Sequence, residues 1–214
     1  MREQLTDLRS TRNPKARIKI MEGHFATVNS HINTYIDMST VKCRHNNGRE
    51  TARVLAEHFR NNTMVDTIVC LDGTEVIGAF MAEFLSDRGI MSINSGNNIS
   101  IITPDVNAYG QLVFMDSTIR MIKNMQALVL AASVTTGRTI AQAAEAVSYY
   151  GGTVGGVAAI FSNVEQTPEE MEIFSIFHKE DLPDYQAYQP SECPMCRRKQ
   201  PLDAIVNSFG YSKL

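Results

Sequence analysis

The fold is decided by residues 127–139, which read ALVLAASVTTGRT. The first five residues are apolar, which is typical of a strand buried on both faces of a parallel sheet. The hydroxyl-rich segment TTGRT follows, and residues 140–150 then show helical spacing of apolar side chains. A buried strand, a short loop and a helix in this order favour a site where free backbone N–H groups at the helix start bind a phosphate.

Several donors in this loop are suited to a phosphate. Thr135, Thr136 and Thr139 offer side-chain hydroxyls. Gly137 lets the backbone approach a ligand closely, and Arg138 adds a positive charge. The alternative is an ordinary polar strand–helix turn in which a threonine caps the helix. The buried strand in front of the loop favours the phosphate site.

Strands and helices alternate along the chain. The expected strands are 34–38, 65–71, 100–103, 127–131, 154–161 and 173–177, and the expected helices are 48–59, 75–87, 117–125 and 140–150. Asn13-Pro14 is typical of a helix start, so a further helix is predicted that buries Ile18 and Ile20 and ends near Gly23. The alternation predicts an α/β fold, with a mainly parallel central sheet and helices on both faces.

Length and composition are those of a globular chain. The 214 residues are 43% hydrophobic and 20% charged with a net charge of −3, which excludes a highly charged disordered chain. One α/β domain is expected over residues 1–180, followed by a C-terminal appendage over 181–214. No apolar run is long enough to cross a bilayer and no signal-peptide core is visible, so we expect a cytoplasmic protein without a membrane partner. The acidity and the lack of a nucleic-acid motif argue against nucleic acid as a partner.

Two of the four cysteines, Cys193 and Cys196, form a C-x-x-C pair. Such a pair can supply half of a tetrahedral Zn²⁺ site. The other half is either Cys43 with His45, or the same pair from a second subunit. The alternative is that the cysteines are reduced, free of metal and near the surface. Cys70 lies within an apolar strand and is expected in the core.

Residues 127–139 resemble the phosphoribosyl-pyrophosphate signature of type I phosphoribosyltransferases. That signature is an apolar strand, two acids, two further residues and then T-T-G-x-T/S. In the family the threonine–glycine part binds the 5′-phosphate, and the two acids bind the ribose hydroxyls. The acid positions fall on Ala131 and Ala132, so both acids are absent from this chain. Each lost charged hydrogen bond forfeits about 1.5–3 kcal/mol.

Residues 69–78, VCLDGTEVIG, resemble the pyrophosphate-binding turn of the same family. The resemblance implies that Asp72, Gly73, Thr74 and Glu75 offer backbone donors to a phosphate or to a metal-bound water. The alternative is an ordinary β–α turn in which Thr74 caps the helix.

Residues 23–37, GHFATVNSHINTYID, are similar to the N-terminal segment of orotate phosphoribosyltransferases, which packs near the base. This similarity favours the orotate branch over purine-base relatives, and it marks residues 1–60 as a hood segment of the domain. A plain packed hairpin is the alternative. The C-x-x-C pair is similar to a cysteine pair near the end of many such enzymes.

The resemblance implies phosphoribosyl transfer from phosphoribosyl pyrophosphate to orotate in pyrimidine nucleotide synthesis, with Mg²⁺ and in a homodimer. Family members carry Lys and Arg on a mobile loop, where the cations neutralise the departing pyrophosphate. Here no Lys or Arg lies between Arg88 and Arg120. Without the acids and the cations the catalytic residues stay unassigned, and whether the chain is an enzyme stays open. The alternative is a non-catalytic protein that binds a nucleotide or sugar phosphate and has lost the transferase residues.

Overall fold

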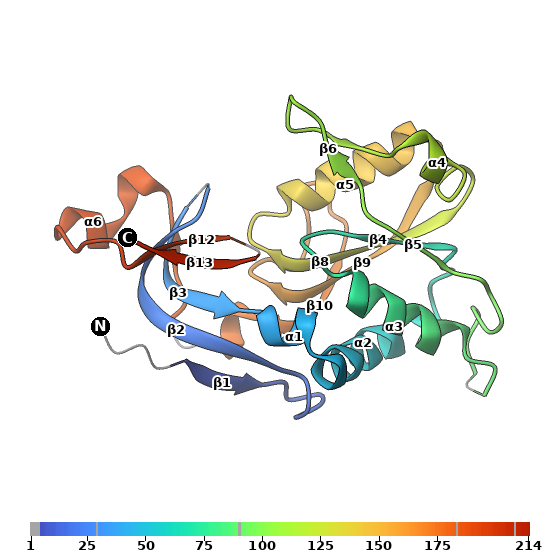
Figure 1. Ribbon diagram of the computed structural model, residues 1–214, viewed down its shortest axis with the longest axis horizontal. Coiled ribbons are helices and arrows are strands. Elements are labelled where there is room, and N and C mark those ends of the chain that lie inside the picture. Colours follow the sequence, from blue (N-terminus) through green and yellow to red (C-terminus); the bar gives the residue numbers. More distant parts are fainter. Residues whose placement is uncertain (1–4, 29, 90, 183, 208) are drawn as a thin grey trace.

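The computed structural model describes residues 5–28, 30–89, 91–182, 184–207 and 209–214. At its centre lies a five-stranded sheet with strand order β10-β9-β8-β4-β5, and all of its pairings are parallel (Figure 1). These strands are β4 (Thr67–Cys70), β5 (Ser100–Ile102), β8 (Gln126–Val134), β9 (Thr153–Ser162) and β10 (Ile173–His178). The predicted mainly parallel α/β sheet is therefore confirmed.

Helices cover both faces of this sheet. On one face α2 (His45–Phe59) packs against α3 (Glu75–Ser86), and on the other face lies α5 (Arg138–Tyr149). Successive strand residues point to opposite faces, so Leu128 and Leu130 belong to the core under α2 and α3 while Val129 belongs to the core under α5. Burial on both faces explains why residues 127–132 of β8 are an unbroken apolar run.

A second sheet, which we call the hood, joins the two ends of the chain. Its strand order is β11-β3-β2-β12-β13, and β1 also pairs with β2. These strands are β1 (Thr6–Arg9), β2 (Arg17–Ala26), β3 (His31–Asp37), β11 (Ala187–Tyr188), β12 (Ala204–Asn207) and β13 (Gly210–Lys213). The hood lies to one side of the parallel sheet in Figure 1. The division of the chain at residue 180 stays a prediction.

Short elements complete the chain. They are α1 (Ser39–Cys43), β6 (Asp105–Val106), β7 (Leu112–Val113), α4 (Asp116–Ile119), the 3-10 helices Lys179–Asp181 and Pro190–Glu192, and α6 (Pro194–Arg197). The antiparallel pair β6–β7 lies between β5 and α4. Among the described residues, no helix combines the length and hydropathy needed to span a membrane.

The predicted helix after Asn13-Pro14 is wrong, because residues 17–26 form strand β2. This strand pairs with β1 along one edge and with β3 along the other. Ile18 and Ile20 are β-branched and suit a strand, and two ladders of hydrogen bonds outweigh a local helix signal. The side chain of Asn13 instead accepts a hydrogen bond of 3.0 Å from the backbone N–H of Lys15, which closes a turn.

Each of the other predicted strands and helices overlaps an observed one. The difference that matters for function is at the end of β8, which continues three residues beyond the predicted limit. Ser133 and Val134 still pair with Phe161 and Ser162 of the neighbouring strand β9. Pairing with β9 therefore extends β8 to the edge of the Thr-Thr-Gly loop at residues 135–137.

Candidate functional site

A pocket of about 40 Å³ opens where β8 ends and α5 begins. Because β4 and β8 are parallel neighbours, the loops after both strands meet at this edge of the sheet, where ligands of open α/β folds bind. The pocket is lined by Asp72, Ala131, Ser133, Val134, Thr135, Thr136, Gly137, Arg138, Thr139 and Ile140. All five residues predicted to bind phosphate therefore lie together at this pocket.

The backbone of the loop is fixed by its neighbours. Gly137 precedes α5 with φ of +78°, a left-handed conformation that favours glycine. A Cβ at this position would lie 3.1 Å from both Cα of Thr167 and Cδ of Pro168, so the β9–β10 connection packs directly on the loop. The backbone N–H of Asn163 also donates a hydrogen bond of 2.8 Å to the carbonyl of Val134. The start of α5 is thus held in place by its neighbours, and the first N–H groups of a helix have no partner within the helix.

Asp72 contributes a carboxylate to the same pocket. Asp72 and Gly73 have φ of +58° and +75°, so the chain turns sharply after β4. The backbone N–H groups of Ala132 and Ser133 donate hydrogen bonds to the Asp72 carboxylate, yet burial dominates and raises its pKa above the ordinary value. Lys42 donates a hydrogen bond of 2.8 Å from Nζ to the backbone carbonyl of Asp72, and burial lowers the pKa of this lysine.

The other residues of the predicted pyrophosphate turn have different surroundings. The hydroxyl of Thr74 is fully buried and donates to the carbonyls of Leu71 (2.8 Å) and Leu130 (3.1 Å), which ties the ends of β4 and β8 together. It forms no side-chain cap on α3. The carboxylate of Glu75 accepts a hydrogen bond of 2.9 Å from the hydroxyl of Thr103, at the end of β5. Of the four turn residues, Asp72 alone lines the pocket.

Ala131 and Ala132, at the acid positions of the family signature, are both buried to 1% exposure. They point to opposite faces of β8: Ala131 joins the core under α5 and lines the pocket, while Ala132 joins the core under α2 and α3. The carboxylate in this pocket is therefore contributed by the neighbouring loop, through Asp72, and not by β8.

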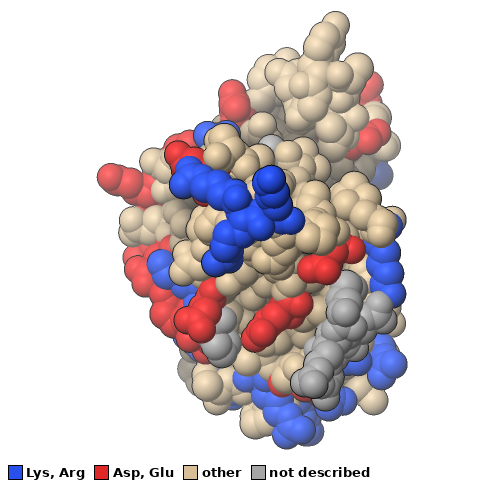
Figure 2. Space-filling view, turned by 90° about the vertical axis from the view of Figure 1, so that its left-hand side faces the viewer, with Lys and Arg blue, Asp and Glu red and all other residues tan. Residues whose placement is uncertain are grey.

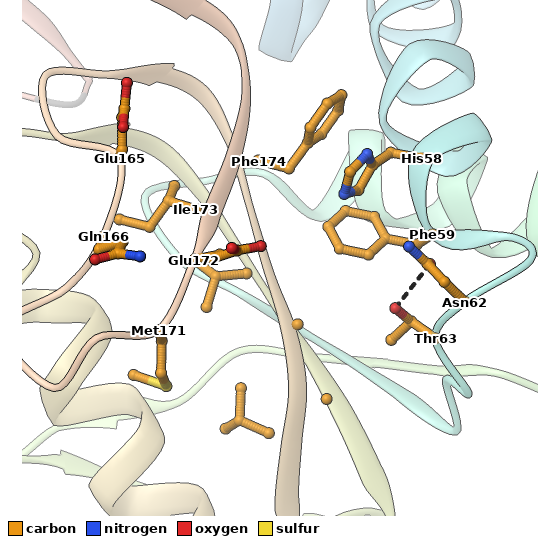
Figure 3. A pocket seen from close by; sticks show the side chains of 14 residues that line it. His58, Phe59, Asn62, Thr63, Glu165, Gln166, Met171, Glu172, Ile173 and Phe174 are labelled. Carbon is orange, nitrogen blue, oxygen red and sulfur yellow. Dashed lines mark hydrogen bonds between the residues drawn. The ribbon is translucent and has the colours of Figure 1, made fainter.

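A larger cavity of about 470 Å³ lies elsewhere, between the end of α2 and the first residues of β9 and β10 (Figure 3). His58 stacks on Phe174 at 3.8 Å between ring centroids, and Glu172 lies nearby. Burial lowers the pKa of His58, and the positive charge of Arg12 lowers it further. Because this cavity is at the amino end of its strands, opposite the edge where α/β sheets bind ligands, we assign the site to the smaller pocket.

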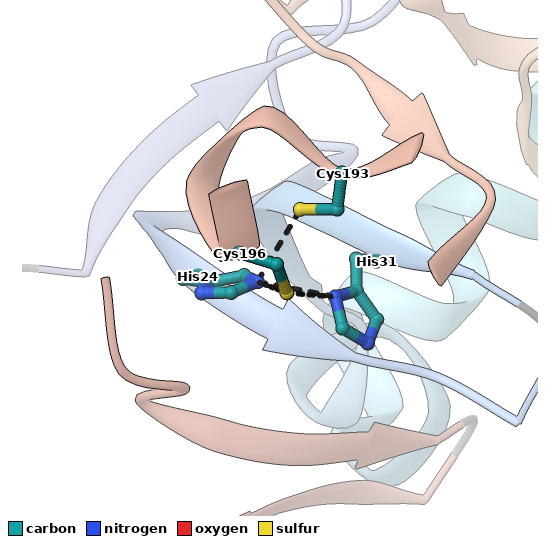
Figure 4. A group of neighbouring side chains, drawn as sticks. All are labelled: His24, His31, Cys193 and Cys196. Carbon is teal, nitrogen blue, oxygen red and sulfur yellow. Dashed lines mark hydrogen bonds between the residues drawn. The ribbon is translucent and has the colours of Figure 1, made fainter. Parts of the chain in front are cut away.

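A third group of polar side chains gathers in the hood (Figure 4). Ligand atoms of His24, His31, Cys193 and Cys196 all lie within 4.8 Å of one another. Cys43 and His45, the partners considered from the sequence, are not in this group: Cys43 is exposed and His45 hydrogen-bonds to Asn46. The sequence signal that we missed is the spacing of His24 and His31, which places both histidines on one β2–β3 hairpin.

The side of the molecule that carries α6 bears charges of both signs. Figure 2 shows a group of Lys and Arg side chains there, with Asp and Glu side chains beside it. The face is therefore not one continuous basic surface of the kind that binds a nucleic-acid backbone. The absence of a nucleic-acid partner stays a prediction.

No protein-family model matches the sequence. The chain is 25% identical over 198 residues to an orotate phosphoribosyltransferase of Chlorobaculum parvum, which covers 86% of this chain and 88% of that protein. A phosphoribosyltransferase of Corynebacterium diphtheriae has a TM-score of 0.55 at 17% identity, over 76% of this chain and 90% of that one. Mycobacterium tuberculosis orotate phosphoribosyltransferase in complex with phosphoribosyl pyrophosphate has a TM-score of 0.51 at 18% identity, over 69% and 82%.

The parallel sheet, the hood and the Thr-Thr-Gly loop define a protein with the type I phosphoribosyltransferase fold. Within that class, the curated sequence relative and the solved neighbours confirm the resemblance to orotate phosphoribosyltransferases.

Proposed function

We propose that this protein binds the 5′-phosphate of a phosphoribosyl ligand at residues 135–139 and transfers the phosphoribosyl group from phosphoribosyl pyrophosphate to orotate. The observation that carries the proposal is the pocket at the end of β8, where a glycine with positive φ leads into the first turn of α5. A helix start of this kind favours a bound anion through its free N–H groups and its dipole. Arg138 adds a positive charge at the pocket.

Asp72 is the residue that we propose to replace the missing ribose-binding acids. Its carboxylate lies against the backbone of Ala132 and Ser133, at the strand end where the family signature carries its acids. An ionised carboxylate accepts hydrogen bonds from hydroxyl groups, and such charge-assisted bonds are stronger than neutral ones. Asp72 therefore supplies from the β4 loop an acceptor that β8 does not provide.

Mg²⁺ fits the oxygen donors at this edge of the sheet. Hard oxygen ligands suit Mg²⁺, which is commonly bound by one or two carboxylates together with substrate phosphates. Asp72, the carboxylate that lines the pocket, is the residue that would hold it together with the substrate phosphates. A bound Mg²⁺ would supply positive charge next to the pyrophosphate, which matters in a chain without Lys or Arg between residues 88 and 120.

A second function, binding without turnover, is favoured by two specific observations. Ala131 and Ala132 are apolar and buried, and the β6–β7 hairpin carries no Lys or Arg. A backbone phosphate site does not need these side chains, so it remains competent when they are absent. The second candidate is therefore a sensor of nucleotides or sugar phosphates.

The two functions are separated by measuring binding and turnover on the same preparation. Orotidine monophosphate formation is followed with orotate, phosphoribosyl pyrophosphate and Mg²⁺, and binding of inorganic phosphate, phosphoribosyl pyrophosphate and nucleoside monophosphates is followed by calorimetry. Turnover supports the transferase, and binding without turnover supports the sensor. The absence of binding to any of these phosphates contradicts both.

We also propose a homodimer, since the resemblance implies one, and a cytoplasmic location. The mass in solution, measured by light scattering over a range of protein concentrations, tests the assembly. A monomer at every concentration contradicts it.

A further inference from the structure

We propose that His24, His31, Cys193 and Cys196 bind one zinc ion and that this site fastens the C-terminal segment to the hood. The four side chains come from β2, β3 and the start of α6, so the cluster joins parts of the chain that are about 170 residues apart in sequence. This inference does not depend on the proposed transferase activity, because the cluster is separate from the pocket at residues 135–139.

Four of the six distances between the ligand atoms match those of a tetrahedral zinc site. With Zn–N bonds of about 2.0–2.1 Å and Zn–S bonds of about 2.3 Å, tetrahedral geometry places two nitrogens about 3.3 Å apart and a nitrogen and a sulfur about 3.5 Å apart. Nε2 of His24 lies 3.2 Å from Nδ1 of His31, 3.5 Å from Sγ of Cys193 and 3.6 Å from Sγ of Cys196. Nδ1 of His31 lies 3.2 Å from Sγ of Cys196.

The surroundings of His24 fix which of its nitrogens faces the cluster as an electron-pair donor. Nδ1 lies 3.0 Å from the carbonyl of Gln200 and 3.2 Å from the carbonyl of Pro201. Carbonyls accept hydrogen bonds and do not donate them, so Nδ1 carries the proton and Nε2 presents its lone pair to the cluster. Metal-binding histidines are commonly oriented by a carbonyl in this way.

Burial also fits a structural ion. His24 and Cys193 are fully buried, while Cys196 is exposed and leaves a route for the metal to enter. Four protein ligands complete a tetrahedron and leave no position for a substrate, which is the pattern of structural and not of catalytic zinc. A set of two thiolates and two imidazoles binds zinc in preference to Mg²⁺, which favours oxygen ligands.

The cluster also links the C-terminal segment to the candidate ligand site. Residues beyond α6 continue into β12, which pairs in parallel with the end of β2, and then into β13. Between these strands Phe209 lies 5.2 Å from Nζ of Lys42, measured to the ring centroid, and its Cε1 would be 3.6 Å from a Cβ built on Gly73. Zinc in the hood therefore positions an aromatic ring beside the turn that carries Asp72.

Metal analysis of the purified full-length chain is the first test. We expect one zinc per chain, retained through dialysis, and loss of this zinc in the double variant Cys193→Ser/Cys196→Ser. Cys43→Ser is the matched control, because Cys43 is an exposed cysteine outside the cluster, and it keeps its zinc. A wild-type chain that contains no zinc and takes up none on titration overturns the proposal, as does a double variant that binds zinc as tightly as the wild type.

A second measurement on the wild-type chain avoids the risk that the double variant does not fold. Replacement of zinc by Co²⁺ should give the intense visible bands of tetrahedral cobalt together with thiolate charge-transfer absorption, and only weak octahedral bands would contradict the geometry. In thiol labelling, Cys43 should react fast, and Cys196 should react only after chelation. Fast labelling of Cys196 before chelation also overturns the proposal. So does a Cys193–Cys196 disulfide in the chain freshly purified under reducing conditions.

Discussion

Replacement of Gly137 by alanine tests whether the loop backbone forms the anion site. The left-handed conformation of this residue, φ +78°, costs a residue with a Cβ about 1–2 kcal/mol. The new Cβ would also lie 3.1 Å from Cα of Thr167 and from Cδ of Pro168. That separation is shorter than the optimum of about 3.5–4.0 Å, so the β9–β10 connection must shift. We add roughly 1 kcal/mol for the overpacking.

The expected total is about 2–3 kcal/mol, which for a chain of this size lowers the melting temperature by roughly 4–12 °C. Gly110→Ala is the matched control. Its φ is +77° but no atom lies within 4 Å of a Cβ built there, so it should lose only the conformational part, about 1–2 kcal/mol. Thermal unfolding of both variants measures the difference.

Phosphate affinity separates the two variants more sharply. The Gly137→Ala change moves the loop where backbone N–H groups converge, so we expect phosphate binding by calorimetry to weaken by at least about tenfold, equivalent to about 1.4 kcal/mol. Gly110→Ala should bind phosphate as the wild type does. Equal melting temperatures for the two variants together with unchanged phosphate affinity in Gly137→Ala would refute the assignment of this loop.

Three further changes give independent tests. Burial raises the pKa of Asp72, so the protonated carboxyl group stabilises the fold at low pH and this contribution is lost as pH rises through the folded-state pKa. In urea unfolding at neutral pH, Asp72→Asn should therefore be more stable than the wild type. The difference in unfolding free energy should close below about pH 3.9, the ordinary pKa of aspartate. A gap that does not change with pH would contradict this. Gly78→Ala places a Cβ 2.6 Å from Sγ of Cys70, and this clash should lower the unfolding free energy by about 1–3 kcal/mol. In a double-mutant cycle, Cys70→Ala should recover part of that loss. Strictly additive effects of the two substitutions on stability would show that the two residues do not clash. Arg138→Ala should weaken phosphate binding at low salt and much less at high salt, as measured by calorimetry at two ionic strengths, because Arg138 is exposed and its charge is screened.

The parallel sheet could be predicted from the sequence because the inner parts of β4, β8 and β9 are buried on both faces and are therefore mainly apolar. The hood could not be predicted in the same way. Strand β2 is only partly buried and alternates irregularly, so its residues fit a helical pattern as well as a strand. What decides its structure is pairing with β1 and β3 and, at its end, with β12, which lies far away in sequence. A pairing of this kind leaves no local signal.

The same distinction explains which parts of the candidate site were predictable. The phosphate loop is one continuous segment whose donors are neighbours in sequence, so a single motif locates it. Lys42 approaches the Asp72 turn through a hydrogen bond from Nζ to a backbone carbonyl, and no motif around Lys42 indicates that contact. The C-x-x-C spacing marks Cys193 and Cys196 as a pair, but His24 and His31 are brought to them only by the folded hood.

The loss of the two acids and the survival of the loop have a common physical basis. Backbone N–H groups do not change when side chains are substituted, so a site built from them persists as long as Gly137 and the start of α5 keep their conformation. Ribose recognition depends on side chains, and at Ala131 and Ala132 these have become part of the core. If Asp72 binds the ribose hydroxyls in place of those acids, Asp72→Asn should reduce the affinity for phosphoribosyl pyrophosphate. The affinity for inorganic phosphate should be unchanged or increased, because phosphate has no ribose hydroxyls and is repelled by a nearby carboxylate. A parallel fall in both affinities would mean that Asp72 merely supports the loop.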